Sequence, residues 1–316
     1  MSDAPAPLRI LVVGAGATGG YFGGRLAAAG RDVTFLVRPA RAARLARDGL
    51  AIRSPRGDAR IAAPAHVTAA TLTDPFDLVL LSCKAYDLDA AMADFAPAVA
   101  ERTAILPLLN GMRHLDALDA RFGAARVLGG TCAISAALDG DGTIVHLNDL
   151  HSLSFGERDG RPSARIAAIA AALRGAVFDA RASEAILRDM WEKWVFLAAL
   201  AGITCLLRAA VGDIVAAGGG GLALALLEEC RETAAAAGFA PREAFMAHAA
   251  AMLSAAGSGF TASMLRDIER GGRIEADHII ADLIRRRDAL GLPAPALLPV
   301  VRAHLAAYEA RRVRAG

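Results

Sequence analysis

One short stretch near the start of the chain limits its fold more than any other. An apolar run, residues 10–13, is followed at once by the glycine-rich sequence GAGATGG and then by a helical pattern. Gly14, Gly16 and Gly19 therefore have the spacing G-x-G-x-x-G between a strand and a helix. The first glycine permits a tight turn, the second lets a ligand approach the backbone, and the third lets helix and strand pack closely. This pattern predicts a helix N-terminus that faces an anion such as the pyrophosphate of a dinucleotide, the alternative being an ordinary glycine-rich turn.

The alternation of apolar runs with helical patterns continues to about residue 181 and predicts a parallel sheet. We expect strands at residues 10–13, 33–37, 78–82, 104–109, 127–136, 143–147, 152–155 and 176–180, a hairpin within 51–67, and helices at 21–29, 41–48, 89–100 and 163–173. From residue 184 onward only helical patterns follow, at 184–201, 203–207, 221–237, 241–255, 263–271, 275–290 and 295–312. The sequence thus predicts an α/β chain, with an N-terminal Rossmann-type doubly wound sheet over residues 1–181 and an all-α C-terminal domain over residues 182–316.

Charge and cysteine content narrow the class of partner. The 35 basic and 33 acidic residues nearly cancel and are spread along the chain, so we expect a small-molecule substrate and neither a nucleic-acid nor a membrane surface. The four cysteines lie far apart without metal-ligand spacing, which predicts buried thiols in a reducing compartment, without disulfides or a metal site. The apolar run 194–207 is short for a membrane span, and residues 1–7 lack the features of a signal peptide. We therefore expect a cytoplasmic protein.

The choice of dinucleotide depends on the end of the second predicted strand. An acidic residue there would hold the ribose 2′-hydroxyl of NAD, but the position carries Arg38, whose guanidinium can pair with a 2′-phosphate. Arg41 follows, and in so arginine-rich a chain it can equally be a solvated surface residue. The missing acid is the firmer argument, and it predicts NADP (NADPH) as the cofactor.

Two rare residue types stand where strands end. The chain has only two lysines, Lys84 and Lys193, only two asparagines, and no glutamine. Lys84 follows the run LVLLSC and Asn110 follows ILPLL, and ligands of open α/β sheets bind outside the carboxyl ends of the strands. We expect Lys84 to contact the cofactor and Asn110 to orient the nicotinamide ribose or the substrate, the alternative being ordinary polar loop residues.

The other lysine lies in a helical, largely apolar stretch. Lys193 is flanked by Trp191 and Trp194 in MWEKWVFLAALAG. Apolar surroundings disfavour the charged form of an amine and bring its pKa toward a range suited to donating a proton. Reduction of a ketone requires such a proton, because hydride arriving at carbon builds negative charge on oxygen. Lys193 is the predicted general acid, although a lysine here can also extend its amine to the surface.

At this point the chain resembles the ketopantoate reductases (2-dehydropantoate 2-reductases) along its whole length. The resemblance rests on GAGATGG, SCKAYD, LLNGM, GGTCAISAALDGDGTIVHL, LSFGE, WEKWVF and SMLRDIERGGRIEADHI. It implies NADPH-dependent reduction of a 2-oxo acid in pantothenate biosynthesis, with Lys193 as proton donor assisted by Glu275. It also implies that Ser263 binds the substrate carboxylate, that Asn110 contacts both substrate and cofactor, and that Lys84 contacts the cofactor. Without the resemblance, Ser263 is best interpreted as a helix N-cap and Glu275 as a solvated acid.

One departure from the family concerns the substrate. In well-studied members, asparagines one and two turns after the lysine hold the substrate's terminal hydroxyl, but these positions are Leu197 and Ala201 here. Loss of such hydrogen bonds favours a more apolar 2-oxo acid. Three hypotheses follow: a ketopantoate reductase, a related NADP-dependent dehydrogenase of a different 2-oxo acid, and an NADP-sensing protein without catalysis. Helical second domains often pair, so we also expect a homodimer.

Overall fold

The computed structural model describes residues 7–315, and the chain divides into two compact units. The first unit runs to Leu109 and resumes over His114–Ile186, and the second consists of Asn110–Arg113 and the chain from Leu187 onward. The predicted domain boundary, after residue 181, falls inside strand β10 (Asp179–Ala182), a few residues before this division. The short loop that follows Leu109 thus belongs structurally with the helical half of the sequence.

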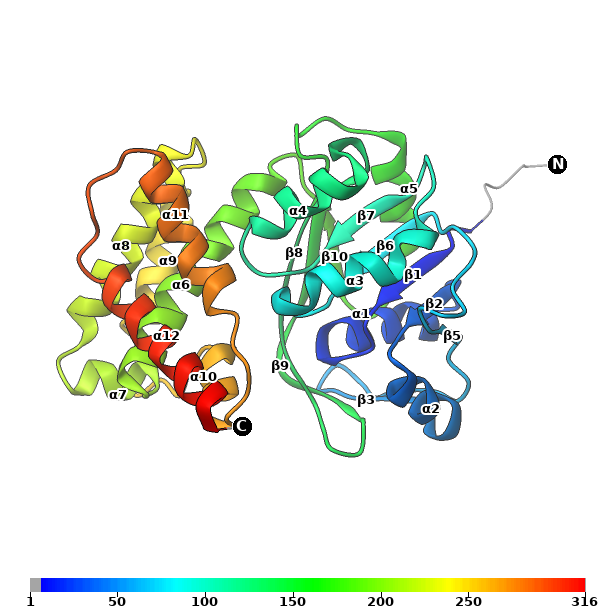
Figure 1. Cartoon of the computed structure of the whole chain (residues 1–316), viewed down its shortest axis with the longest axis horizontal. Coiled ribbons are helices and arrows are strands. Elements are labelled where there is room, and N and C mark those ends of the chain that lie inside the picture. The colour runs from blue at the N-terminus through cyan, green and yellow to red at the C-terminus, as the bar shows by residue number, and fades with distance from the viewer. Residues whose placement is uncertain (1–6, 316) are drawn as a thin grey trace. The chain divides into compact units, whose positions relative to one another are not determined.

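The first unit contains a five-stranded parallel sheet (Figure 1). Its order is β5-β2-β1-β6-β7, and all four neighbouring pairs are parallel. The strands are β1 (Ile10–Val13), β2 (Val33–Leu36), β5 (His66–Val67), β6 (Leu78–Leu81) and β7 (Ala104–Pro107). Strands β1, β6 and β7 are buried at every residue, which explains their continuous apolar sequences. The predicted α/β class and doubly wound parallel sheet are confirmed.

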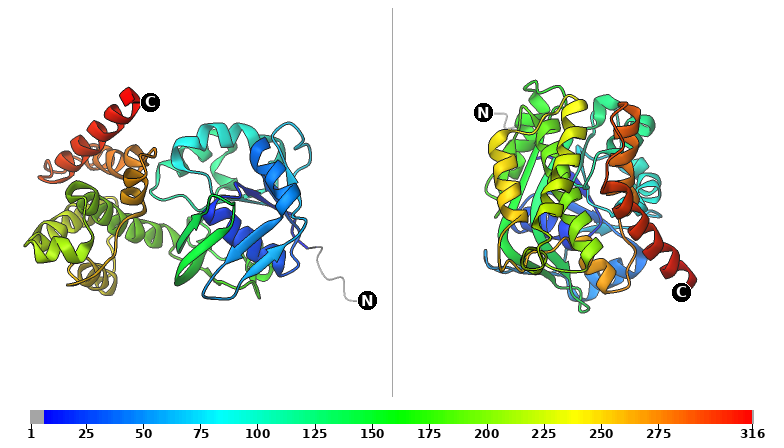
Figure 2. Two further views of the ribbon diagram at one scale, coloured as in Figure 1. Left: turned by 90° about the horizontal axis from the view of Figure 1, so that it is seen from below. Right: turned by 90° about the vertical axis from the view of Figure 1, so that its left-hand side faces the viewer.

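The rest of the first unit contains a second sheet, which the sequence analysis did not separate from the first. Its order is β10-β9-β3-β4, and β8 pairs antiparallel with β9 along nearly the whole length of β9. The strands are β3 (Leu50–Arg53), β4 (Ala59–Ile61), β8 (Gly129–Leu138), β9 (Ile144–Gly156) and β10 (Asp179–Ala182). Strands β3 and β4 form the predicted hairpin, and the left view of Figure 2 shows this blue hairpin beside the green strands. The predicted strands 143–147 and 152–155 are parts of one long strand, β9.

Helix α1 (Ala17–Ala28) packs against both sheets. A side chain at three of its glycines would collide with one sheet or the other. A Cβ at Gly23 would lie 2.7 Å from Phe35 of the first sheet, and one at Gly20 would lie 2.4 Å from Ile144 of the second. At Gly24 the obstructing side chains are those of β3, at 2.8 Å. The sequence ATGGYFGG therefore allows one helix to lie close to two sheets at once.

The remaining helices of the first unit connect its strands. They are α2 (Pro39–Asp48), α3 (Leu88–Phe95), α4 (Arg113–Phe122) and α5 (Ala164–Leu173). Helix α5 begins as expected, with the Ser163 hydroxyl accepting a hydrogen bond from the amide of Ile166 at 3.2 Å. Helix α4 was not predicted. The strand predicted at 176–180 lies instead at β10, where the pairing with β9 begins at Asp179, and the buried residues Ala176 and Phe178 precede it.

The second unit is helical, as predicted (Figure 1). Its helices are α6 (Ile186–Leu207), α7 (Val211–Ala216), α8 (Gly220–Ala236), α9 (Glu243–Leu253), α10 (Ser263–Glu269), α11 (Asp282–Ala289) and α12 (Leu298–Ala315). A π-helical segment, Asp277–Ala281, precedes α11 where a continuous α-helix was expected. The short helix α7 was not predicted. Of the Gly218–Gly221 run, Gly218, at a φ of +82°, and Gly219 lie between α7 and α8, whereas Gly220 and Gly221 begin α8.

Helix α6 is longer than the apolar run 194–207 that the sequence showed. The apolar run 194–207 continues an apolar helix of 22 residues, which by length and composition alone is long enough to cross a membrane. However, 72% of its most apolar window, of mean hydropathy 1.5, is buried inside the protein. Gly202 does not break the helix, which continues through it to Leu207, and a Cβ there would only just contact Leu226 and Val301, at 3.4 and 3.5 Å. Burial of this kind is typical of a core helix.

A buried polar cluster joins α1 to β9 in the first unit. The Tyr21 hydroxyl and His151 Nδ1 are 2.8 Å apart, and the His146 ring is 5.7 Å from that of His151. His146 Nδ1 lies 2.8 Å from the Ser54 hydroxyl. Arg25 lies over the Tyr21 ring and donates to a loop carbonyl, while its Nε is buried without a hydrogen-bond partner. An additional positive charge in this cluster would be poorly compensated.

This cluster predicts acid sensitivity of the first unit. Burial lowers the pKa of His151 below its ordinary value of 6.5, and Arg56, His146 and Arg25 act in the same direction against Asp179. The unfolded chain therefore takes up the proton first, so this stabilisation is complete above pH 6.5 and is lost as the pH falls below it. We expect the melting temperature to decline below that pH, and the decline to be smaller in His151→Gln. The exposed His248→Gln variant should behave like wild type, and equal slopes for all three proteins would contradict the prediction.

Candidate functional site

The glycine turn has the conformation that its spacing predicted. Gly14 follows β1 at a φ of +93°, and Gly16 is the N-cap of α1. A Cβ at Gly19 would lie 2.0 Å from the Ser82 hydroxyl oxygen and 2.2 Å from the Gly14 carbonyl oxygen, whereas a Cβ at Gly16 would meet nothing within 4 Å. Gly19 is thus required by the protein's own packing, and Gly14 by its positive φ. The space in front of Gly16, at the N-terminus of a twelve-residue helix, fits a pyrophosphate bound through backbone amides.

The predicted cofactor residues lie at one edge of the parallel sheet. In the strand register, Val13 is opposite Leu36 and Leu81, so β1, β2 and β6 end side by side. Arg38 and Lys84 follow two of these strand ends, and both are exposed. The Arg38 guanidinium forms an ion pair at 3.1 Å with Asp87, three residues after Lys84. Gly14, Arg38 and the segment after β6 are therefore neighbours, as ligand binding at strand ends requires.

Arg41 is part of this edge, although the sequence left it open as a solvated residue. Its Nε donates to the Ala15 carbonyl oxygen at 3.1 Å, and both terminal nitrogens donate to the Gly142 carbonyl oxygen at 3.3 Å. Burial, with a contribution from Arg44, lowers the pKa of Arg41. Arg41 thereby links the glycine turn to the turn between β8 and β9. The only available signal was its position one helical turn after Arg38.

In the second unit, Lys193 is half-buried on α6 between two buried tryptophans. The Trp191 and Trp194 rings are 4.8 Å apart. The neighbouring Glu192 is buried and accepts hydrogen bonds from the Arg242 backbone and side chain, at 2.7 and 2.8 Å. The acid beside Lys193 is therefore engaged with an arginine. One and two turns further along α6, Leu197 is half-buried and Ala201 is buried.

The π-helical segment Asp277–Ala281 receives contacts from the elements that carry three predicted site residues. Glu275 lies two residues before it, and the Glu275 carbonyl oxygen accepts hydrogen bonds from the amides of His278 and Ile279. On α6, Trp194, next to Lys193, donates its indole N–H to the Ile279 carbonyl oxygen at 2.9 Å. A Cβ at Gly111, next to Asn110, would lie 3.0 Å from the His278 ring. The structure thus brings the surroundings of Asn110, Lys193 and Glu275 to one short segment.

The same segment is held by an ion pair and contains a buried histidine. Arg113, at the end of the loop that contains Asn110, pairs with Asp277. Burial lowers the pKa of His278, against the opposing effects of Glu275 and Asp282. The neutral imidazole can therefore be packed beside the Asn110 loop without a counter-charge. Sequence reasoning assigned no role to Trp194 or His278, because aromatic residues on apolar helix faces are usually core residues.

Ser263 occupies a different element from the other predicted residues. It is the exposed first residue of α10, and the N-cap is Ala262, so the interpretation of Ser263 as a capping residue is wrong. Helix α12 holds the connection between α10 and Glu275: the Tyr308 hydroxyl donates to the Gly272 carbonyl oxygen at 2.7 Å, and Glu309 accepts from the Ile274 amide at 2.8 Å. The hydroxyl of Ser263 is accessible to a ligand.

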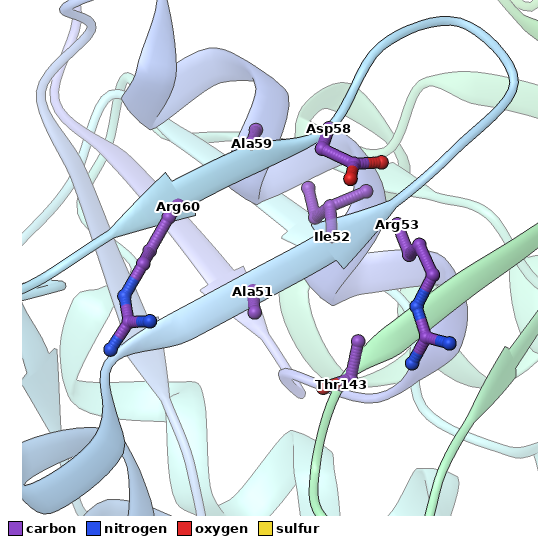
Figure 3. Close-up of a pocket in the computed structure, with 7 residues that line it drawn as sticks. All are labelled: Ala51, Ile52, Arg53, Asp58, Ala59, Arg60 and Thr143. Atoms are coloured by element: carbon purple, nitrogen blue, oxygen red, sulfur yellow. The ribbon is translucent and has the colours of Figure 1, made fainter.

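A shallow depression elsewhere on the first unit contains none of the predicted site residues (Figure 3). It lies on the β3–β4 hairpin and the start of β9, and it is lined by Ala51, Ile52, Arg53, Asp58, Ala59, Arg60 and Thr143. Arg53 forms a long ion pair at 3.7 Å with Asp139 of the neighbouring turn. The arrangement is that of a solvated hairpin surface, and we assign it no role.

Comparison with known proteins accounts for nearly the whole chain. Residues 10–160 match the family model described as ketopantoate reductase PanE/ApbA, and residues 185–307 match that of its C-terminal part. The chain is 38% identical over 306 residues to the uncharacterized oxidoreductase YkpB of Bacillus subtilis, covering 96% of this chain and all of that protein. It is 28% identical over 285 residues to a 2-dehydropantoate 2-reductase of Archaeoglobus fulgidus, covering 90% and 92%.

The fold agrees with a crystal structure from the same group of proteins. The 2-dehydropantoate 2-reductase of Geobacter metallireducens superimposes with a TM-score of 0.86 at 30% identity, covering 94% of this chain and 99% of that one. Both matched regions and the overall fold therefore extend over both units.

Proposed function

Because the chain belongs to the ketopantoate reductase family, we propose that it is an NADPH-dependent reductase of a small 2-oxo acid, 2-dehydropantoate or a more apolar relative. The observation that carries the proposal is the arrangement around the π-helical segment. Elements bearing Asn110, Lys193 and Glu275 all contact it. An amide, an amine and a carboxylate are the groups that binding and protonating a ketone require.

In this proposal the protein's own groups supply orientation and the proton. When bound, NADPH provides the hydride that adds to the keto carbon. The Lys193 ammonium donates a proton to the keto oxygen as negative charge develops there, and Glu275 orients that ammonium. The Asn110 amide and the Ser263 hydroxyl hold the substrate, the latter at its carboxylate. Gly14, Gly16, Gly19 and Lys84 hold the cofactor.

The preference for NADPH is supported by the residues at the end of β2. Arg38 occupies the position of the acid that selects NAD, and its guanidinium is 71% exposed. It can therefore leave its ion pair with Asp87 and meet a 2′-phosphate at small cost, since exposed pairs contribute about 1 kcal/mol or less.

The substrate class is suggested by α6. Leu197 and Ala201 present hydrocarbon one and two turns after Lys193, where an amide would select a hydroxylated substrate. A site without such donors does not discriminate strongly in favour of a hydroxyl group. If 2-dehydropantoate is nevertheless the substrate, the enzyme acts in pantothenate biosynthesis. We further propose that it works in the cytoplasm, where its free thiols stay reduced, and as a homodimer.

The direct test is oxidation of NADPH and of NADH by the wild-type protein with a panel of 2-oxo acids of graded size, including 2-dehydropantoate. We expect turnover with NADPH and with at least one member. Activity restricted to apolar members would exclude 2-dehydropantoate but retain the reaction. Tight binding of NADPH without turnover on any member would indicate a sensor and contradict the proposal.

The cofactor preference is tested in the same assay with Arg38→Asp. The new carboxylate should repel a 2′-phosphate and accept from a ribose hydroxyl, shifting the ratio of kcat/KM for NADPH and NADH toward NADH by about tenfold or more. Arg47→Asp is the control, since Arg47 is exposed near the end of the same helix, α2. An unchanged ratio in Arg38→Asp would overturn the assignment of NADPH.

A further inference from the structure

The backbone of Ile279 lies between the two residues of the proposed proton-donor pair, Lys193 and Glu275. Its amide and its carbonyl oxygen both form hydrogen bonds, one toward each member of the pair. Its amide donates to the Glu275 carbonyl oxygen at 3.0 Å, and its carbonyl oxygen accepts from Trp194 Nε1 at 2.9 Å. Trp194 is the residue after Lys193 in the chain. A short connection therefore runs from Lys193 through the Trp194 indole and one peptide residue to the backbone of Glu275.

The Trp194 indole is buried, and its N–H has a backbone acceptor. Its side chain is 1% exposed, its ring is 4.8 Å from that of Trp191, and the guanidinium carbon of Arg286 lies 5.9 Å from its centre. A buried N–H in such surroundings needs an acceptor, and Ile279 supplies it. The indole therefore determines where the π-helical segment lies against α6.

The acceptor lies in an unusual part of the helix. Segment Asp277–Ala281 is π-helical, and α11 continues from it at Asp282. A π-helical turn contains an extra residue compared with an α-helical one, and such turns are frequent at functional sites. Here the wider turn begins two residues after Glu275, and its His278 and Ile279 amides donate to the Glu275 carbonyl oxygen. The position of the turn therefore decides where the Glu275 side chain begins.

We propose that Trp194 is a positioning residue, whose indole N–H holds Glu275 in register with Lys193 through Ile279. The inference rests on the proposed function, in which Glu275 orients the Lys193 ammonium. Trp194 itself touches neither substrate nor cofactor in this scheme. Trp194 affects the rate through the position of Glu275, since a displacement of about 1 Å in a catalytic group can cost about a hundredfold in rate.

The test removes the N–H and keeps an aromatic ring. Trp194→Phe should lower kcat about tenfold and leave KM for NADPH unchanged, the loss expected when one buried hydrogen bond no longer fixes the geometry. Trp191→Phe is the matched control, because it truncates the adjacent indole, which packs on Trp194 and Phe239. It should retain kcat within about twofold.

A double-mutant cycle separates positioning from general damage. If Trp194 acts through Glu275, then Trp194→Phe should lower kcat in the wild-type background but have little further effect in a Glu275→Gln background. The pH profile of kcat should change in the same way in both single variants. Additive losses, or a lower melting temperature with unchanged kcat and pH profile, would overturn the proposal and leave Trp194 as an ordinary core residue.

Two provisions keep the test decisive. If Trp194→Phe does not fold, 3-benzothienylalanine at position 194 replaces only the N–H by sulfur and retains the ring size, with the same expected results. A readout without turnover is also available, because the chain has only two lysines. Reductive methylation with ¹³C-formaldehyde should change in rate at Lys193 but not at Lys84 in Trp194→Phe, and not further in the Glu275→Gln background.

These measurements distinguish the two possible failures. No turnover by wild type on any 2-oxo acid, with the expected methylation pattern, would refute the proposed function and retain the link between Trp194, Glu275 and Lys193. Turnover by wild type with an unchanged methylation rate and kcat in the 194 variant would refute the link and retain the function.

Discussion

Replacing Lys193 with methionine should lower kcat for 2-oxo acid reduction by about 10²- to 10⁴-fold, the usual contribution of a general acid. Methionine matches the unbranched stem of lysine, so the half-buried position on α6 stays filled and the fold should be retained. Binding of NADPH, followed by fluorescence titration, should be unaffected.

Lys84 provides the control for this prediction, since it is the only other lysine. Lys84→Met should raise KM for NADPH, because we place Lys84 among the cofactor-binding residues, and should lower kcat far less than Lys193→Met does. Turnover in Lys193→Met within about twofold of wild type would remove Lys193 from its proposed role. Equal effects of both substitutions on NADPH binding would mean that the two lysines serve the cofactor alone.

Gly19→Ala should destabilise the first unit by about 3 kcal/mol or more, through overpacking of a site that has no room. The added methyl group would lie 2.2 Å from the Gly14 carbonyl oxygen, which is backbone and cannot rotate away. It would also lie 2.0 Å from the Ser82 hydroxyl, which already donates to the Val13 carbonyl oxygen at 2.9 Å. Thermal unfolding should show a drop of about 10 °C, with poor recovery of soluble protein.

Gly16→Ala is the matched substitution within the same motif. Nothing lies within 4 Å of the added Cβ, and the φ of −83° suits alanine. The melting temperature should therefore stay close to that of wild type, while the Kd for NADPH rises about tenfold or more as the methyl group obstructs the pyrophosphate. Unimpaired NADPH binding by Gly16→Ala would contradict the placement of the pyrophosphate. A stable Gly19→Ala would contradict the packing account.

The sequence predicted best where a segment's local pattern and its tertiary environment agree. Strands β1 and β6 are short, wholly buried and continuously apolar, and the glycine spacing has a local geometric cause. Helix α5 begins at a serine that caps it. In each case the residues that determine the local structure lie within one short segment, so the sequence of that segment was enough to predict it.

The errors arose where the deciding contacts come from far along the chain. Strand β9 runs through LNDLHS because β8 pairs with nearly its whole length, with one irregularity between Ile134 and Ala136. The second sheet is separate because β9 also pairs with β3 and β10 rather than with the first sheet. Helix α7 is only six residues long, too short to show a period. Neither these strand pairings nor so short a helix produces a recognisable pattern in the local sequence.

Some residues of the candidate site could be predicted from the sequence, and others could not. Residue types that are rare in this chain identified Lys84, Asn110 and Lys193, and the resemblance to the family added Glu275 and Ser263. The roles of all five are still predictions. Arg41 was left open and Trp194 was given no role, because both act through backbone acceptors that residue types do not reveal. These acceptors are the carbonyl oxygens of Ala15, Gly142 and Ile279.

The close fit of α1 between two sheets has a consequence for ligand affinity. A loop that must become ordered when it captures its ligand loses conformational entropy, and the association weakens accordingly. Here sheets on both sides immobilise the helix, and Arg41 ties the preceding turn to a neighbouring one, before any nucleotide arrives. Nucleotide association should therefore be fast and accompanied by little change in amide exchange along residues 14–24.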